Sequence, residues 1–131
     1  MIGNSILLDT NIVIDLFKGD NKTVNILENK ENIFIATAVL AELYLGAYRS
    51  INMQKHIEQI KGFLNRCKVL NADSDTAEKY AIIKTTLFQK GKPIPENDIW
   101  IAATSLQHNI PLFTRDKHFE EVNMINILTR E

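Results

Sequence analysis

Cysteine is almost absent from this chain: Cys67 is the only one among 131 residues. One thiol cannot form a disulfide within the chain, so a reducing cytoplasm is the expected location. Long apolar runs are also missing, since none approaches the roughly 20 residues that a membrane helix needs. The N-terminal sequence MIGNSILLDTN has neither a basic region nor a small-residue cleavage site, so we expect no signal peptide and no membrane partner.

The chain also lacks a strong excess of charge of either sign. It has 15 Lys and Arg against 16 Asp and Glu, which gives a formal net charge of -1 and a pI near 6.3. This balance excludes a globally basic nucleic-acid-binding protein but allows a local basic patch. A hydrophobic content of 45% and a charged content of 24% are ordinary, and we predict a single domain over residues 1–131.

Short apolar runs alternate with segments of helical periodicity along the chain. The predicted strands are residues 5–9, 33–36, 68–70, 110–114 and 124–128, and the predicted helices are 12–18, 22–30, 38–48, 53–65, 75–90 and 98–108. Strands separated by helices favour parallel pairing. The expected fold class is therefore α/β, a three-layer α/β/α sandwich around a central, mainly parallel five-stranded sheet.

Several helix ends are predicted from capping residues. Thr37 and Asn97 precede apolar helical segments and are expected to act as N-caps. Asp75, with Glu78 three residues later, has the spacing of a capping box. Gly91 is expected to end the helix that begins there, because glycine is favoured just beyond helix C-termini.

Three acidic residues stand alone in apolar segments. Asp9 is the only charged residue in MIGNSILLDTNIVI, Glu42 in TAVLAELYLGAY, and Asp98 in NDIWIAATSL. A carboxylate in a core-forming segment is costly to desolvate unless it is paired, and these segments contain no Lys or Arg. A divalent cation shared by these residues and Asp116 would remove the cost, which predicts a metal site.

The predicted elements place these acids near one edge of the sheet. Asp9 ends the first strand, Asp116 follows the fourth, and Glu42 lies early in the helix after the second. Functional groups of open parallel sheets gather beyond the carboxyl ends of the strands. Taken singly, Asp9 could be an N-cap, Asp116 a turn residue and Asp98 a partner of a helix dipole. It is the combination that favours a shared site.

Four stretches in order, LLDTNIVIDL, AELYLGA, ENDIWIAAT and LFTRDKHF, make the chain resemble PIN-domain ribonucleases, and within them the VapC-type toxins of toxin–antitoxin pairs. The resemblance spans nearly the whole chain and implies a PIN-like fold. It carries the family's acidic metal-binding quartet and the polar residue before its last acid onto Asp9, Glu42, Asp98, Asp116 and Thr114.

The resemblance implies Mg²⁺-dependent hydrolysis of RNA phosphodiester bonds, with Mn²⁺ as a possible alternative ion. Hard divalent cations prefer oxygen ligands, which suits carboxylates. Asp9, Asp98 and Asp116 would make the closest metal contacts, Glu42 would hold a water or a second ion, and Thr114 would hydrogen-bond a ligand or water. A tRNA or rRNA substrate, an antitoxin protein and a second copy of the chain are the implied partners.

Other residues near these motifs have plainer interpretations. Glu96 is expected to be a solvated loop residue and His118 a surface residue, and the three histidines share no spacing typical of a zinc site. Tyr44 and Tyr48, with Leu45 between them, form an apolar edge that belongs either to the core or to an antitoxin-binding surface. Basic residues that could contact RNA phosphates are Lys18, Arg49, Lys90, Lys92, Arg115 and Lys117.

Alternative functions make different demands on the same motifs. A haloacid dehalogenase-type phosphatase needs an acid two residues after Asp9, where this chain has Asn11, and a phosphoreceiver domain needs an acidic pair there. A dinucleotide-binding domain needs a glycine-rich turn that DTNIVI does not supply. A housekeeping PIN nuclease of RNA processing and a catalytically silent PIN-like binding module remain open alternatives.

Overall fold

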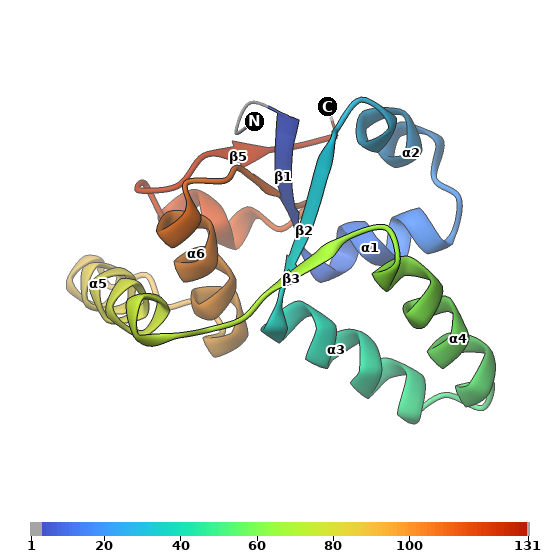
Figure 1. Ribbon diagram of the computed structural model, residues 1–131. Helices are drawn as coiled ribbons and strands as arrows, with labels where there is room; N and C mark the ends of the chain where they lie inside the picture. Colours follow the sequence, from blue (N-terminus) through green and yellow to red (C-terminus); the bar gives the residue numbers. More distant parts are fainter. Residues whose placement is uncertain (1–3, 131) are drawn as a thin grey trace.

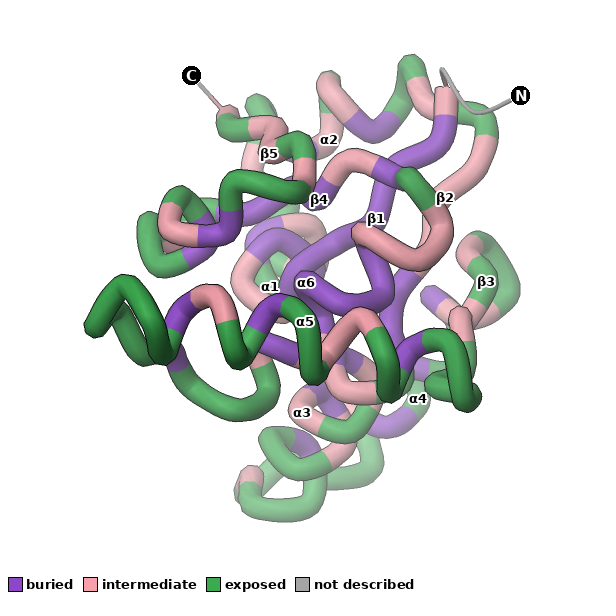
Figure 2. The backbone as a smooth tube through the Cα atoms, turned by 90° about the vertical axis from the view of Figure 1, so that its left-hand side faces the viewer, coloured by how far each residue is buried: buried purple, intermediate pink, exposed green. Residues whose placement is uncertain are grey.

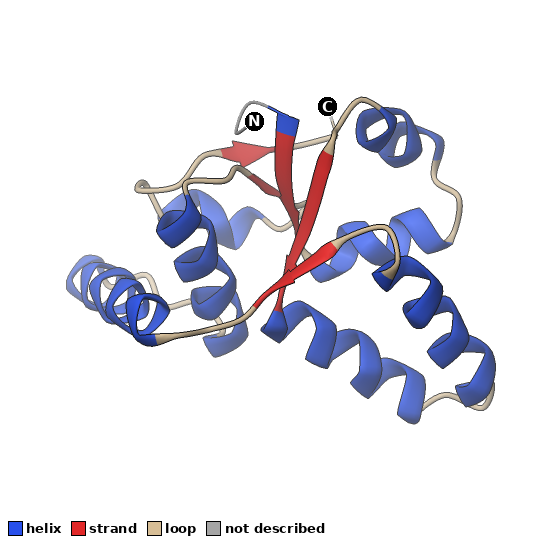
Figure 3. Ribbon diagram, viewed as in Figure 1, coloured by secondary structure: helices blue, strands red, loops and turns tan. Residues whose placement is uncertain are grey.

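A computed structural model describes residues 4–130 and places a five-stranded sheet at the centre of the molecule (Figure 3). The strand order is β3-β2-β1-β4-β5, and every neighbouring pair is parallel. The strands are β1 (Ser5–Leu8), β2 (Asn32–Ala36), β3 (Lys68–Leu70), β4 (Leu112–Phe113) and β5 (Ile127–Leu128). This topology confirms the α/β prediction.

Helices cover both faces of this sheet. They are α1 (Thr10–Phe17), α2 (Asn21–Glu28), α3 (Thr37–Tyr48), α4 (Met53–Leu64), α5 (Ser74–Lys90) and α6 (Glu96–His108), followed by the short 3-10 helix η2 (Lys117–Glu121). Figure 1 shows α5 and α6 on one side of the sheet and α1, α2 and α4 on the other. Within residues 4–130, no helix has both the length and the apolar character needed to cross a membrane.

The central strand, β1, could be predicted from the sequence because it is buried. All four residues of β1 are buried, and Ile6, Leu7 and Leu8 have no exposed surface. A strand covered by helices on both faces shows a continuous apolar run instead of alternation. Figure 2 shows the buried backbone concentrated in β1 and α6, while much of α5 is exposed.

The last two strands are shorter than predicted. The runs 110–114 and 124–128 were expected to be strands, but only two residues of each form β4 and β5. Asn109 has a left-handed backbone with φ of 53°, and Pro111 follows, so the chain reaches its extended course late. Met124 lies in a turn before β5.

The predicted cap at Thr37 is wrong. Strand β2 runs directly into α3, so Ala36 is the N-cap and Thr37 is the first helical residue. The Thr37 hydroxyl instead donates to Oδ1 of Asn71 at 3.3 Å, beside the end of β3. The hydroxyl that was expected to cap α3 therefore bonds to the residue that follows β3.

Two further N-caps were also wrong, although the C-cap was right. The capping box of α5 is formed by Asp73 and Thr76, two residues before the predicted one. Helix α6 begins at Glu96 with Pro95 as N-cap, so Asn97 lies in its first turn. Gly91 ends α5 as predicted, with φ of 68°.

Candidate metal centre and active site

Asp9 lies where β1 passes into α1. It is the N-cap of α1, since its Oδ1 accepts the backbone N–H of Thr10 at 2.8 Å. Its Oδ2 accepts the hydroxyl of Thr114 at 2.6 Å and the Asn11 side-chain amide at 3.2 Å. The residue is 4% exposed, and burial raises the pKa of Asp9 against the opposing effect of these bonds. One carboxylate, that of Asp9, therefore both caps α1 and belongs to the predicted metal site.

Thr114 connects Asp9 to Asp116. It follows β4, which pairs with β1, and it is buried. While its hydroxyl donates to Asp9, the same oxygen accepts the backbone N–H of Asp116 at 2.9 Å. Asp116 in turn is the N-cap of η2, since its Oδ1 accepts the N–H of His118 at 3.0 Å.

Glu42 reaches the same edge of the sheet from α3. Because α3 continues β2 without a break, its first turns lie beside the end of β1. The Glu42 carboxylate accepts the hydroxyl of Thr10 at 2.9 Å, and Thr10 is the residue after Asp9. Glu42 therefore has a neutral hydrogen-bond donor as its partner.

Asp98 completes the group from the first turn of α6. Its side chain is 15% exposed, and burial raises its pKa to about 6, with further contributions from the negative charges of Asp9, Asp116 and Glu42. Repulsion from all three acids means that the four carboxylates lie within electrostatic reach of one another. The structure thus brings the four predicted acids together.

The four acids suit a hard divalent cation. Within residues 4–130 no Lys or Arg forms an ion pair with any of them. The partners of these carboxylates are hydroxyl, amide and backbone N–H groups, and the one imidazole of His118. Clustered carboxylates without a cationic side chain supply oxygen ligands and negative charge, which is the donor set that Mg²⁺ and Mn²⁺ prefer.

Two residues flanking the quartet are exposed, as predicted, but make contacts that were not predicted. Glu96 is the first residue of α6 and not a loop residue, but it lies outside the cluster: its carboxylate binds the Lys84 ammonium at 2.8 Å and the Tyr80 hydroxyl on α5. His118 is 53% exposed, yet its Nδ1 lies 2.9 Å from Oδ1 of Asp116 and 3.6 Å from Oδ2 of Asp98. His118 is therefore a surface residue that also lies beside two of the four acids.

An ion pair beside the site was missed from sequence. Asp15 on α1 is 9% exposed, and its carboxylate accepts Nε of Arg115 at 2.6 Å and Nη2 at 3.2 Å. Arg130 also lies 3.3 Å from Asp15 and 2.9 Å from Asp20. The isolation of Asp15 in IVIDLF was a usable signal, although its partner lies 100 positions away.

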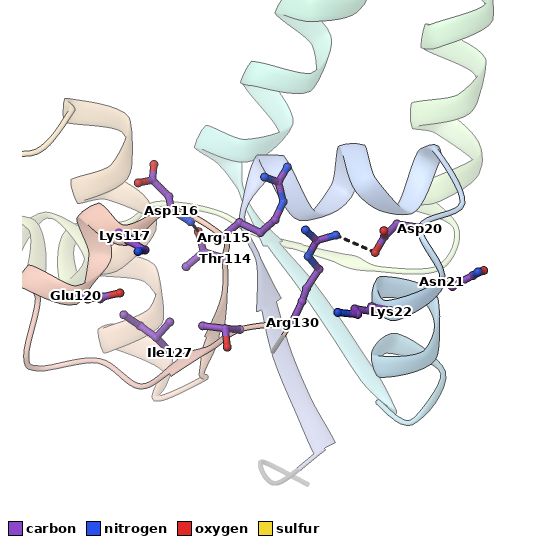
Figure 4. Close-up of a pocket in the computed structure, with 11 residues that line it drawn as sticks. Asp20, Asn21, Lys22, Thr114, Arg115, Asp116, Lys117, Glu120, Ile127 and Arg130 are labelled. Atoms are coloured by element: carbon purple, nitrogen blue, oxygen red, sulfur yellow. Dashed lines mark hydrogen bonds and ion pairs between the residues drawn. The ribbon is translucent and has the colours of Figure 1, made fainter.

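A groove of about 580 Å³ runs from Asp116 toward the start of α2 (Figure 4). It is lined by Asp20, Asn21, Lys22, Thr114, Arg115, Asp116, Lys117, Glu120, Ile127, Thr129 and Arg130. Four of these residues carry positive charge: Lys22, Arg115, Lys117 and Arg130. Basic groups thus line an open path that begins at one of the four acids.

A second groove of about 470 Å³ lies between α1, α3 and α4. Its lining includes the apolar side chains of Ile14, Phe17 and Leu43, and it ends at Glu42. Lys18 and Lys55 stand at the same groove. An apolar floor of this kind resembles the core of a protein-binding surface, and Lys18 and Lys55 would belong to its polar rim.

The model of one protein family, the PIN domain, matches residues 6–124. This chain belongs to the PIN-domain family. The match includes all four acids and Thr114. Among relatives of this PIN domain, ribonuclease VapC2 of Haemophilus influenzae is 35% identical over 121 residues, which cover 88% of this chain and 90% of the relative. A tRNA(fMet)-specific endonuclease VapC of Salmonella typhimurium is 30% identical over 126 residues, covering 92% and 94%.

Solved structures have the same PIN fold. VapBC2 of Rickettsia felis, bound to a DNA fragment from its promoter, contains a chain that superposes with a TM-score of 0.89 at 28% identity, covering 95% of this chain and 98% of that one. DNA-bound VapBC of Salmonella typhimurium gives 0.90 at 25% identity, covering 97% and 98%. This PIN domain is thus of the VapC type that its motifs indicated.

Proposed function

We propose that this PIN domain is a metal-dependent endoribonuclease that hydrolyses RNA phosphodiester bonds and acts as the toxin of a toxin–antitoxin pair. The observation that carries the proposal is the convergence of Asp9, Glu42, Asp98 and Asp116 at one sheet edge without a Lys or Arg partner in the described chain. Ribonuclease VapC relatives support the choice of RNA as substrate.

In the proposed metal centre, some residues bind the cation and others position those that bind it. Asp9, Asp98 and Asp116 would hold the cation, Mg²⁺ or Mn²⁺, and Glu42 would complete the acidic set. The chemistry supplied by such a cation would be stabilisation of negative charge at the scissile phosphate and a lower pKa of the attacking water. Thr114 fixes the carboxylate of Asp9 and the backbone of Asp116 through one hydroxyl, and Thr10 orients Glu42.

The groove beside Asp116 is the proposed path of the RNA strand. Lys22 and Lys117 line it and would contact backbone phosphates on one side of the cleavage point, beside Arg115 and Arg130, which are paired with Asp15 and Asp20. Such contacts position a strand without reading its sequence. A structured RNA, tRNA or rRNA, is the proposed substrate class, and the name of the Salmonella typhimurium relative supports tRNA.

The groove between α1, α3 and α4 is the proposed seat of the antitoxin. Several of the most similar solved structures are VapBC complexes, in which the VapC-like chain is accompanied by a second protein. Glu42 is one of the residues that line the groove, so an occupant would lie against the acidic centre. Leu45 is 56% exposed and Tyr48 62%; they do not line this groove, and their apolar edge on α3 is a second candidate surface for a partner. A homodimer and a cytoplasmic location remain part of the proposal.

Cleavage of a total tRNA and rRNA mixture tests this function. Purified, antitoxin-free protein is incubated with RNA and Mg²⁺, with RNA and EDTA, and as the variants Asp98→Asn and Glu96→Gln. These two acids share the first turn of α6, but only Asp98 belongs to the cluster. With Mg²⁺, but not with EDTA, we expect discrete RNA fragments from the wild type and from Glu96→Gln. Asp98→Asn should give none under either condition.

Each failure points to a defined alternative. If folded, antitoxin-free protein binds RNA but yields no fragments with Mg²⁺ or Mn²⁺, the silent binding module is the better description. If Asp98→Asn cleaves as well as Glu96→Gln does, the acidic cluster is not the active site. If the protein cleaves RNA with metal but brings down no partner protein when it is purified from its native cells, a housekeeping PIN nuclease is favoured.

A further inference from the structure

His118 is held against the acidic cluster by the fold. It lies in η2, the 3-10 helix capped by Asp116, and its backbone N–H donates to Oδ1 of that cap. The next residue, Phe119, has no exposed surface and anchors η2 in the core. The backbone of His118 is therefore fixed beside Asp116, and its imidazole starts from a position next to that carboxylate.

The imidazole nitrogen lies at a ligand's distance from two of the acids. Nδ1 is 2.9 Å from Oδ1 of Asp116 and 3.6 Å from Oδ2 of Asp98, and these residues each offer a ligand atom within 4.8 Å of the others. Ligands at about 2.1 Å from one ion and at right angles to each other are roughly 3 Å apart. A single cation can therefore reach all three groups with small movements of the side chains.

We propose that His118 supplies a nitrogen ligand to the cation held by Asp98 and Asp116, so that this site binds Mn²⁺ in preference to Mg²⁺. The inference rests on the proposed metal dependence and adds a ligand to it. Imidazole suits transition metals, whereas Mg²⁺ strongly prefers oxygen. Coordination through Nδ1 leaves the ring proton on Nε2, and because the side chain is half-exposed, that N–H can donate a hydrogen bond to water.

Pulsed electron paramagnetic resonance of the Mn²⁺-loaded protein tests the ligand directly. A coordinated imidazole nitrogen gives a ¹⁴N modulation of the Mn²⁺ signal, and this readout does not depend on RNA cleavage. We expect the modulation in the wild type and in His108→Gln, and its loss in His118→Gln. His108 is the matched control because it ends α6, at the far end of the helix from Asp98.

Titration calorimetry measures the affinities of the protein for Mn²⁺ and Mg²⁺. The His118→Gln substitution is expected to weaken Mn²⁺ binding about tenfold and Mg²⁺ binding less than about threefold, since one nitrogen ligand is lost from an otherwise oxygen-based site. Circular dichroism confirms that the variant is folded. Wild-type protein grown with ¹⁵N-histidine gives the same answer without a substitution, because the ¹⁴N modulation must change to that of ¹⁵N.

The outcomes separate this inference from the proposed function. If Mn²⁺ binds to the wild type and is lost in Asp116→Asn, but no nitrogen modulation is seen, the His118 ligand is wrong and the metal centre stands. A modulation that persists in His118→Gln likewise overturns the ligand alone. If neither Mn²⁺ nor Mg²⁺ binds to folded wild-type protein, both the ligand and the proposed metal dependence fail.

Discussion

The Thr114 hydroxyl donates to Oδ2 of Asp9 at 2.6 Å, across 105 positions of sequence. The same oxygen accepts the N–H of Asp116 at 2.9 Å, so one buried side chain fixes two of the four acids. Groups that orient metal ligands affect affinity and activity strongly, although they do not contact the ion. Among the described residues, the Thr114 hydroxyl is the only group that hydrogen-bonds to both Asp9 and Asp116.

The substitution Thr114→Val should remove this link while keeping the shape of the side chain. The hydrogen bond from Thr114 lowers the pKa of Asp9, so its loss raises that pKa further and leaves the carboxylate less able to bind a cation. We expect RNA cleavage and Mn²⁺ affinity to fall about 10- to 100-fold, as measured by kcat/KM and by calorimetry. Thr114→Ser, which keeps the hydroxyl, should remain near wild type. Equal activity of the Val and Ser variants would contradict the positioning role.

The paired arginines make Asp15 a stability determinant. Its side chain is 12% exposed and binds Arg115 and Arg130, which tie the β4–η2 loop and the C-terminal segment to α1. Asp15→Asn keeps the shape but leaves Arg115 with a neutral partner and Arg130 with Asp20 as its remaining carboxylate, so we expect a loss of about 1–3 kcal/mol in the free energy of unfolding. Urea denaturation measures this loss.

Glu28→Gln is the control for that experiment. Glu28 is exposed, and in residues 4–130 its carboxylate has no hydrogen bond or ion pair. We expect its variant to unfold within about 0.5 kcal/mol of the wild type. If Asp15→Asn changes stability no more than Glu28→Gln, the ion-pair network contributes nothing measurable.

The acids were predictable because isolation in an apolar segment is visible in the sequence. Asp9, Glu42 and Asp98 stand out for this reason, and β1 was found because burial on both faces produces an apolar run. Their partners were not predictable. The Thr10–Glu42 bond joins residues 32 positions apart, and only the pairing of β1 with β2 brings them together.

Helix starts failed for a different reason, which is local ambiguity. Asp73 and Asp75 are equally good capping residues by type, and only the backbone path selects Asp73. The contacts of His118 were not predicted because spacing between histidines was the criterion, whereas its neighbours are the carboxylates of Asp116 and Asp98. Mixed ligand sets from separate elements have no fixed spacing in sequence.

The raised pKa of Asp98 predicts how metal-free stability depends on pH. Its folded pKa is about 6, above the ordinary value of 3.8, so the folded state binds the proton more tightly than the unfolded state does. Protonated Asp98 therefore contributes to the free energy of unfolding. This contribution is fully present below pH 4 and is lost as pH rises through about 6. In EDTA at pH 8, Asp98→Asn should therefore be more stable than the wild type, by about 1–2 kcal/mol after solvent screening.

Divalent cations should reverse that order. With Mn²⁺ at pH 8 the wild type gains the free energy of ion binding, and Asp98→Asn gains less of it. Urea denaturation at pH 5 and pH 8, with EDTA and with Mn²⁺, gives the four comparisons. A metal-free difference between the two proteins that does not grow from pH 5 to pH 8 would show that Asp98 ionises normally.

The groove between α1, α3 and α4 can be filled without disturbing the core. Gly46 lies on α3 at this groove, and a Cβ added there meets nothing within 4 Å. Gly46→Gln should raise the helix stability of α3 by about 0.5–1 kcal/mol, because glycine is unfavourable in a helix interior. The same side chain should obstruct the proposed antitoxin seat and weaken antitoxin binding about tenfold or more, as measured by calorimetry.

Gly62→Gln supplies the matched comparison. Gly62 lies within α4, is exposed, and has the same open space around an added Cβ, but it does not line the groove. Both variants should therefore gain helix stability, and both should cleave RNA as the wild type does. Only Gly46→Gln should escape inhibition by the antitoxin. If the two variants bind the antitoxin equally well, the partner sits elsewhere, and the exposed edge of Leu45 and Tyr48 becomes the next surface to substitute.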